Sequence, residues 1–305
     1  MRKVSLLAMV LSAACGGGGG NDSIDAPGTG DDGAVDVDAP AGAIDARTID
    51  APSGPDADPS TLPHFSFFVT SLRALQELSG NPQGFGGDLR FGEVGDQNSG
   101  AGLRGADKLC ATIAERSMPG ASAKQWRAFL SVSNDGNGNV VNAIERIGNG
   151  PWYDRNGRLL APDLTNLRNI RPLGGDPSIK NDFPNEDGVT NHNPDLTGNV
   201  DNHDMLTGTN SQGLLELDSL GANKRTCLNW TANAGNKPVE GQPRVGHSWP
   251  RDSQLNMMNS WMSSLIESGC APGVSLIEMG PPNPNSNTVG SGGGYGGFFC
   301  FALVP

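Results

Sequence analysis

Four cysteines in the last two thirds of the chain set the strongest limit on what it can fold into: Cys110, Cys227, Cys270 and Cys300. Their number is even, and neighbouring cysteines are at least 30 residues apart, which differs from the short Cys-x-x-Cys spacing of metal sites. Three disulfide pairings are open to four cysteines. We favour the nested pairing, Cys110–Cys300 with Cys227–Cys270, in which the first bridge would tie a predicted helix to the last predicted strand.

The N-terminus predicts export, and disulfides persist in the oxidising compartments that export reaches. Arg2 and Lys3 precede an apolar run of about eight residues that is too short to span a bilayer. Small residues then lead to Cys15, as in the lipobox of bacterial lipoproteins, although Ser12 stands where that motif prefers Leu. We therefore expect residues 1–15 to be a lipoprotein signal peptide, with Cys15 lipidated and the membrane as a partner. An ordinary signal peptide with an incidental cysteine is the alternative.

The next segment, residues 16–60, predicts a disordered tether. A short unit of Ile or Val, Asp, Ala and often Pro recurs in it, with no aromatic residue and no helical or strand periodicity. Such a segment cannot bury enough apolar surface to offset the entropy of ordering, about 1–2 kcal/mol per residue. Residues 21–60 hold ten Asp and one Arg, so most of the formal charge of -12 lies in the tether. We expect a spacer at the cell envelope, anchored to the outer membrane or cell surface.

Residues 61–305 predict one globular α+β domain. Its expected strands are 64–69, 126–132, 143–147, 152–153 and 298–303, and Asn156-Gly157 favours a hairpin turn. The apolar spacing predicts a helix at 102–116, a short helix at 72–78 and a second amphipathic helix at 255–266. The segment 176–204 is rich in Asn, Asp and Pro and predicts a long surface loop. The formal charge of -12 argues against nucleic acid as a partner, because phosphate binding needs clustered Lys and Arg.

Several short motifs in the domain resemble the endostatin-like domain found at the C-terminus of certain collagens and in bacterial surface lipoproteins. They run in the family's order: Gly105-Ala106-Asp107 before Cys110, Arg127-Ala128-Phe129-Leu130-Ser131, Leu206-Thr207-Gly208-Thr209, Cys227-Leu228-Asn229-Trp230, Gly246-His247-Ser248 and Phe299-Cys300. The resemblance implies a C-type-lectin-like fold, with a mixed sheet, two helices, long irregular loops and the nested disulfides. The family's zinc histidines are not carried over, because His64 stands alone.

The polar segment 176–204 is the best candidate for a ligand site. Calcium binds six to eight oxygen ligands, and irregular loops with several carboxylates supply them. The candidate ligands are Asp182, Asp187, Asp195, Asp201 and Asp204. Calcium is the cofactor that these residues favour, and a solvated loop without metal is the alternative. His192 and His203 lie in the same segment and raise a transition metal as a further hypothesis.

The sequence predicts no catalytic machinery. His247 and Ser248 are adjacent, but a nucleophilic triad requires Ser, His and an acid that converge in space. We expect that histidine to be a structural residue hydrogen-bonded to the backbone, and the five tryptophans to lie in the core, with Trp152 and Trp249 the least certain. The expected function is a non-enzymatic, lipid-anchored surface binding or adhesion protein with a glycan or protein ligand. A structural envelope lipoprotein and an extracellular hydrolase are the alternatives.

Overall fold

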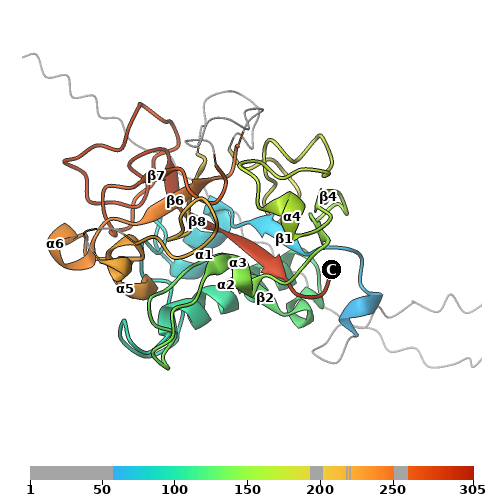
Figure 1. The fold of residues 1–305 in the computed structure, drawn as a ribbon, viewed down its shortest axis with the longest axis horizontal. Helices are drawn as coiled ribbons and strands as arrows, with labels where there is room; N and C mark the ends of the chain where they lie inside the picture. Colours follow the sequence, from blue (N-terminus) through green and yellow to red (C-terminus); the bar gives the residue numbers. More distant parts are fainter. Residues whose placement is uncertain (1–57, 193–201, 218, 220, 251–259) are drawn as a thin grey trace, which may run out of the picture. The chain divides into compact units, whose positions relative to one another are not determined.

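The computed structural model describes residues 58–192, 202–217, 219, 221–250 and 260–305 (Figure 1). The predicted signal peptide, Cys15 and the tether up to residue 57 lie outside these residues and stay predictions. Asp58 caps a 3-10 helix, η1 (Pro59–Thr61), by accepting a hydrogen bond from the Ser60 amide. The described structure therefore begins three residues before the predicted start of the domain at 61.

The domain is α+β, as predicted, and its main sheet is built around the last strand, β8 (Gly294–Ala302). β8 pairs antiparallel with β1 (Phe67–Val69) and β2 (Trp126–Ala128), and parallel with β5 (Asp204–Leu206). The sheet continues through β6 (Arg244–His247) to β7 (Leu265–Ile266). Since β1 and β8 are paired, the first and last strands of the domain lie side by side in this sheet.

A separate hairpin joins β3 (Trp152–Tyr153) to β4 (Leu159–Ala161). The Asp154 carboxylate accepts hydrogen bonds from the amides of Asn156 and Arg158, and Gly157 adopts a positive φ of 73°. The turn predicted from Asn156-Gly157 is thus confirmed, because glycine adopts the left-handed conformation there without steric cost.

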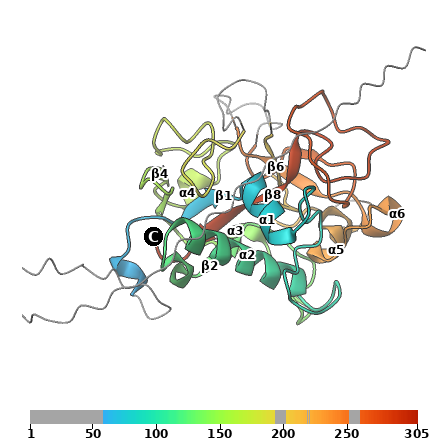
Figure 2. The same cartoon turned by 180° about the vertical axis from the view of Figure 1, so that it is seen from behind.

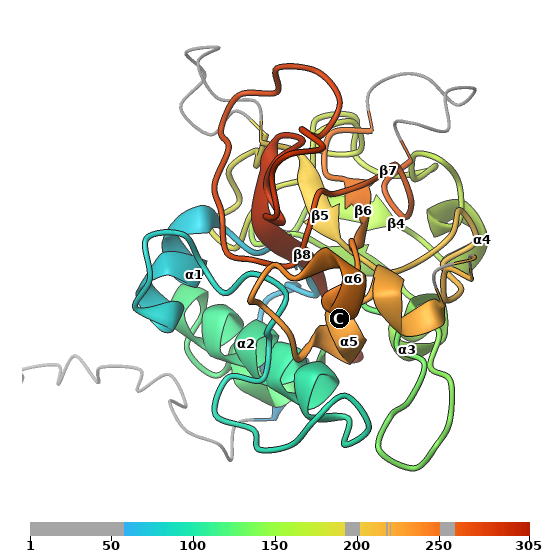
Figure 3. The ribbon, with the colours of Figure 1, turned by 90° about the vertical axis from the view of Figure 1, so that its left-hand side faces the viewer.

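Two helices longer than one turn occur in the described residues, and both contact β8. They are α1 (Leu72–Ser79) and α2 (Ala101–Ser117), which lie on one side of β8, while β5, β6 and β7 lie on the other (Figure 3). Ser71 caps α1 through its hydroxyl group, and Gly80 ends the helix in the left-handed conformation. The remaining helical segments are η2 (Ala121–Lys124), α3 (Ala143–Arg146), α4 (Leu164–Leu167), η3 (Ala222–Arg225), α5 (Cys227–Trp230) and α6 (Lys237–Glu240). Among the described residues, no helix has both the length and the apolarity needed to cross a bilayer.

The core is aromatic, and its tryptophans are hydrogen-bonded. Four of the five are fully buried, each donating its indole N–H to a backbone carbonyl: Trp126 to Ala121, Trp152 to Ile147, Trp230 to Ser131 and Trp261 to Leu167. Buried Trp needs such a partner because its N–H would otherwise lose its hydrogen bond to water. Trp152 is therefore a core residue, and Trp249 is half-buried.

The structure contains both bridges of the nested pairing. Cys110 of α2 is bonded to Cys300 of β8, and Cys227 is bonded to Cys270. All four cysteines are fully buried. The first bridge fixes the long helix to the central strand, and the second holds α5 beside the segment that follows β7.

Three predictions from local sequence are wrong. The predicted helix 255–266 is not helical over its described part, 260–266, where Leu265 and Ile266 form β7. The predicted strand 143–147 is a single helical turn, α3. The segment 176–204 is not a surface loop throughout, because Ile179 and Phe183 are fully buried and Asp204 begins β5.

Gly105 lies in α2, which Figure 2 shows from behind, and it allows the helix to approach the chain at Leu89 and Arg90. A Cβ atom at Gly105 would lie 2.2 Å from the carbonyl oxygens of both residues. Glycine to alanine normally stabilises a helix by about 1 kcal/mol, but here the added methyl group has no space. We expect Gly105→Ala to lower the free energy of unfolding by about 1–3 kcal/mol in a denaturant titration.

The control for this prediction is Thr112→Ala in the same helix. The hydroxyl group of Thr112 bonds only to the carbonyl of Lys108, one turn earlier, so its loss should change stability little. Equal stability of Gly105→Ala and the wild type would contradict the close approach of helix and chain.

Candidate functional site

The first part of the predicted polar loop folds into a tight turn beside β1. The Asn185 side chain accepts hydrogen bonds from the amides of Asp187 and Val189, at 3.0 and 3.2 Å. The backbone closes the same turn, because the Asn185 amide donates to the Val189 carbonyl at 2.8 Å. Asparagine side chains form such turns readily, which explains why this polar segment has a defined shape.

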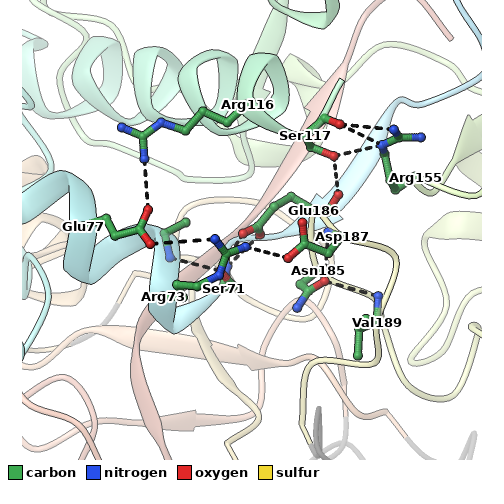
Figure 4. Close-up of polar contacts among 11 residues, drawn as sticks. Ser71, Arg73, Glu77, Arg116, Ser117, Arg155, Asn185, Glu186, Asp187 and Val189 are labelled. Carbon is green, nitrogen blue, oxygen red and sulfur yellow. Dashed lines mark hydrogen bonds and ion pairs between the residues drawn. The ribbon is translucent and has the colours of Figure 1, made fainter. Parts of the chain in front are cut away.

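Glu186 fixes this turn to the start of α1 (Figure 4). Its carboxylate accepts hydrogen bonds from the Ser71 amide at 2.9 Å and from the Ser71 hydroxyl group at 2.5 Å. A carboxylate is favourable at the N-terminus of a helix, where amide groups point outward. Burial raises the pKa of Glu186, and the Ser71 bonds oppose that rise. Glu186 is thus a positioning residue that holds the turn against the helix.

An exposed network of charges covers the other side of the turn. Figure 4 shows Arg73 directed towards Asp187 and Glu77, and Arg116 directed towards Glu77. The Arg73 to Asp187 distance is 2.6 Å, and their side chains are 62% and 47% exposed. Ion pairs that are this exposed contribute about 0–1 kcal/mol to stability. A ligand group can therefore replace either partner of Arg73–Asp187 at little cost to the fold.

A pocket of 320 Å³ opens between α1 and this turn. Helix α1 and its cap contribute polar, apolar and cationic groups, and the loop contributes three amides and a carboxylate. The lining residues are Ser71, Leu72, Arg73, Gln76, Asn185, Asp187, Asn191, Asn202 and Leu276. We call this the α1 pocket. A mixture of convergent hydrogen-bonding groups with some apolar surface is typical of sites for small polar ligands.

Tyr295 of β8 contacts Asn191, one of the residues that line the α1 pocket. Its hydroxyl group donates to the Thr70 carbonyl at 2.6 Å and lies 3.0 Å from the side-chain oxygen of Asn191. Burial raises the pKa of Tyr295, so the phenol keeps its proton and remains a donor. Asn191 in turn lies 3.5 Å from the Asn202 side chain. The two amides are therefore presented to the pocket in a fixed arrangement.

Three of the four histidines gather with Trp249 beyond the loop. The rings of His203 and His247 stack with centroids 3.9 Å apart, and those of His192 and Trp249 at 4.2 Å. Asp182 lies 2.7 Å from Nδ1 of His192. Among the described residues, no three His, Cys, Asp or Glu side chains are grouped so that they could hold a metal ion. In both stacked pairs, the faces of the histidine rings make packing contacts.

The His247-Ser248 pair has the structural geometry expected of it. Nδ1 of His247 accepts a hydrogen bond from the Trp249 amide at 3.1 Å. Ser248 is fully buried, so its side chain does not face solvent. The pair therefore forms part of the turn that follows β6.

A buried pair of carboxyl groups, Asp204 and Glu267, lies beside the histidines. Both residues have no exposed surface, and oxygens of both carboxyl groups lie beside Gly292. Glu267 also accepts hydrogen bonds from the Gly292 amide and the Ser291 hydroxyl group, each at 3.0 Å. Burial raises the pKa of Glu267 to about 7. Glu267 therefore holds its proton to a higher pH than an exposed carboxyl group does, because burial disfavours the charged form.

The described calcium candidates lie in three different places. Asp187 pairs with Arg73 at the α1 pocket, Asp182 contacts His192, and Asp204 is buried beside Glu267. Asp195 and Asp201 lie outside the described residues, so a calcium site that includes them stays a prediction. The structure does not bring Asp182, Asp187 and Asp204 to one point.

Comparison with known proteins returned no matching family model, curated protein or solved structure. The α1 pocket is therefore assessed on its own geometry. The sequence pointed to the polar segment that forms one side of this pocket, and of the candidate residues named there Asp187 lines it. Sequence reasoning missed Arg73 and Gln76, which lie more than 100 residues earlier and carry no local signal of a site.

Proposed function

We propose that this protein is an exported, lipid-anchored surface binding protein whose α1 pocket takes a hydroxyl-rich ligand such as a glycan. The observation that carries the proposal is the convergence of amide, carboxylate, guanidinium and hydroxyl groups around one pocket of 320 Å³. Sugar hydroxyl groups both donate and accept hydrogen bonds, and side chains of these types satisfy both needs. Leu72 and Leu276 provide apolar contact for the ring carbons.

The same proposal includes the anchor and the domain type. Cys15 would carry the lipid, residues 16–60 would separate the domain from the outer membrane or cell surface, and the domain would be endostatin-like with a C-type-lectin-like fold. Three features support that domain type: β1 pairs with β8, two helices pack beside the sheet, and the disulfides are nested. The position of the pocket on the long polar segment is a fourth, because lectin-like domains often bind ligands there.

The test is a glycan array probed with the full-length protein and two matched variants. Arg73→Ala removes a guanidinium group from the pocket, and we expect it to lower the affinity for any bound glycan by about tenfold or more. Arg116→Ala is the control, since Arg116 also pairs with Glu77 but does not line the α1 pocket. Each variant breaks only exposed ion pairs, so their thermal midpoints should match the wild type.

Two results would count against the proposal. If the wild type binds no glycan on the array, the ligand class is wrong. If Arg73→Ala and Arg116→Ala weaken binding equally, the ligand lies elsewhere or the effect is one of overall charge.

A further inference from the structure

A second and larger pocket, of 490 Å³, lies at the other end of α1. The loop that connects α1 to α2 contributes most of its lining residues. Figure 3 shows this loop passing along α2. The lining residues are Leu78, Ser79, Asn81, Gly84, Phe85, Asp88, Arg90, Phe91, Gly92, Glu93 and Asn233. We call this the aromatic pocket. It shares no residue with the α1 pocket.

Phe91 is held in this pocket in an unfavourable backbone conformation. The Glu93 amide donates to the Arg90 carbonyl at 2.8 Å, and the two central residues of this turn, Phe91 and Gly92, have φ values of 41° and 83°. Glycine and asparagine favour such a turn, whereas a bulky aromatic residue there is strained. Strained residues of this kind cluster at binding sites, where the surrounding structure holds a side chain in place for a ligand.

Packing holds the Phe91 ring in a defined orientation while leaving it half-buried. The Phe85 ring meets it edge-on with centroids 6.0 Å apart, and the Lys108 ammonium group lies 5.6 Å from its centroid. Phe85 is also half-buried, so both rings contribute accessible aromatic surface. Two oriented rings at one pocket offer a platform for the apolar face of a ligand ring.

The polar groups of the aromatic pocket are fixed and balanced in charge. Asp88 accepts two hydrogen bonds from the guanidinium group of Arg90, and Glu93 pairs with Arg104 at 3.0 Å. Each carboxylate that lines the pocket thus has a cationic partner, so its negative charge attracts a cationic ligand less strongly. The carboxylate oxygens and the side chains of Asn81 and Asn233 can still form hydrogen bonds with a neutral ligand.

We infer that the aromatic pocket is a second ligand site that takes a ring of a neutral saccharide. The C–H face of the sugar ring packs on Phe91 and Phe85, and its hydroxyl groups bond with Asp88 and the two asparagines. This goes beyond the proposed function, because the site is a different pocket built from different residues.

The two pockets open on different faces of α1. Gln76 lines the α1 pocket and Leu78 lines the aromatic pocket, and side chains two residues apart point about 200° from each other around a helix axis. The two sites are therefore separate, and each is tested by its own variant.

The test is calorimetric titration of the full-length protein with two neutral probes, cellohexaose and chitohexaose. Phe91→Gly removes the ring and relieves the backbone strain, so the variant should fold as stably as the wild type. We expect it to lower the affinity for the probe that binds by about tenfold. Val94→Ala is the matched control, because Val94 is an exposed apolar residue of the same loop that does not line the pocket.

The outcomes separate this inference from the proposed function. If Phe91→Gly weakens binding and Val94→Ala does not, the second site is supported, whatever Arg73→Ala does. If Phe91→Gly binds both probes as the wild type does, or if the wild type binds neither probe, the inference is overturned. In the first of these cases, a loss of binding in Arg73→Ala would still support the α1 pocket alone.

Discussion

Replacement of Cys110 and Cys300 by alanine is expected to leave the domain largely unfolded at 37 °C. The bridge spans 190 residues, and on the chain-entropy estimate a loop of that length is worth about 5 kcal/mol. Domains of this size have total stabilities of about 5–15 kcal/mol, so the loss removes a large share of the total. The loss is also local, because α2 would no longer be bonded to the strand at the centre of the sheet.

The second bridge provides the matched comparison. Cys227 and Cys270 are separated by 43 residues, which corresponds to about 4 kcal/mol on the same estimate. We expect the Cys227→Ala, Cys270→Ala double variant to be destabilised but less severely. The measurement is a denaturant titration of the full-length protein followed by near-ultraviolet circular dichroism, which reports tryptophan packing. A Cys110→Ala, Cys300→Ala variant that unfolds at the wild-type midpoint would contradict the role assigned to the first bridge.

Elements that depend on local pattern were predictable from the sequence. The spacing of Ala106, Leu109, Cys110 and Ile113 predicts one apolar helix face, and all four are buried in α2. The aromatic run before Cys300 predicts a buried strand, and β8 contains it. In both places the local periodicity and the tertiary burial agree, so the local pattern is sufficient.

The helix that was wrongly predicted at 255–266 shows that local apolar spacing is not always sufficient. Trp261 and Met262 are buried, as a helix face would require, but they lie in a bend before β7. The Trp261 amide donates to the Ile170 carbonyl and its indole N–H to the Leu167 carbonyl. These contacts come from a segment about 90 residues earlier, and local spacing carries no information about them.

The turn at α5 could not be predicted for a different reason. Residues 227–230 all have positive φ values, between 46° and 64°, which costs roughly 1–2 kcal/mol for each L-residue. The disulfide at Cys227 and the side-chain bonds of Asn229 to Ser133 and Gln97 help to hold this conformation. Gly102 of α2 gives the turn space, since a Cβ atom there would lie 2.3 Å from the Asn229 carbonyl oxygen. The conformation results from partners far apart in the sequence.

Only the loop side of the α1 pocket was predictable from the sequence. The density of Asn and Asp in 176–204 indicated a ligand-binding loop, and Asn185, Asp187 and Asn191 do line the α1 pocket. The residues of α1 that line the other side of the pocket resemble any other residues of an amphipathic helix. The burial of Phe183 and Asp204 was also not predicted, because the loop around them is polar. A single apolar residue, or the first residue of a short strand, is too weak a signal in such a segment.

Glu267 is expected to make the stability of the domain fall as the pH rises from about 4.5 to 7. Burial raises its pKa in the folded state to about 7, from an ordinary value of 4.5. The folded protein therefore holds the proton more tightly than the unfolded chain does. Its contribution to stability is fully present below pH 4.5 and is lost as the pH rises through 7, and the difference between these limits is about 3 kcal/mol.

Glu267→Gln removes this dependence because glutamine stays neutral at every pH. We expect the variant to match the wild type at pH 5 within about 1 kcal/mol and to exceed its stability at pH 8 by about 2–3 kcal/mol. The measurement is a set of denaturant titrations from pH 4.5 to 8.5. Glu278→Gln is the control, since it replaces a half-exposed carboxyl group near His203 and should keep the wild-type slope.

We expect the ionisation of Glu267 to affect the α1 pocket as well. Asn202 lines that pocket, and Asp204, two residues later, lies near Glu267, since both carboxyl groups are beside Gly292. Ionisation of Glu267 would add a buried negative charge next to Asp204 and weaken the packing around Asn202. On the proposed function, glycan affinity at the α1 pocket should therefore decline between pH 6 and 8 in the wild type and stay level in Glu267→Gln. An equal pH slope in both proteins, for stability and for binding, would contradict the role assigned to Glu267.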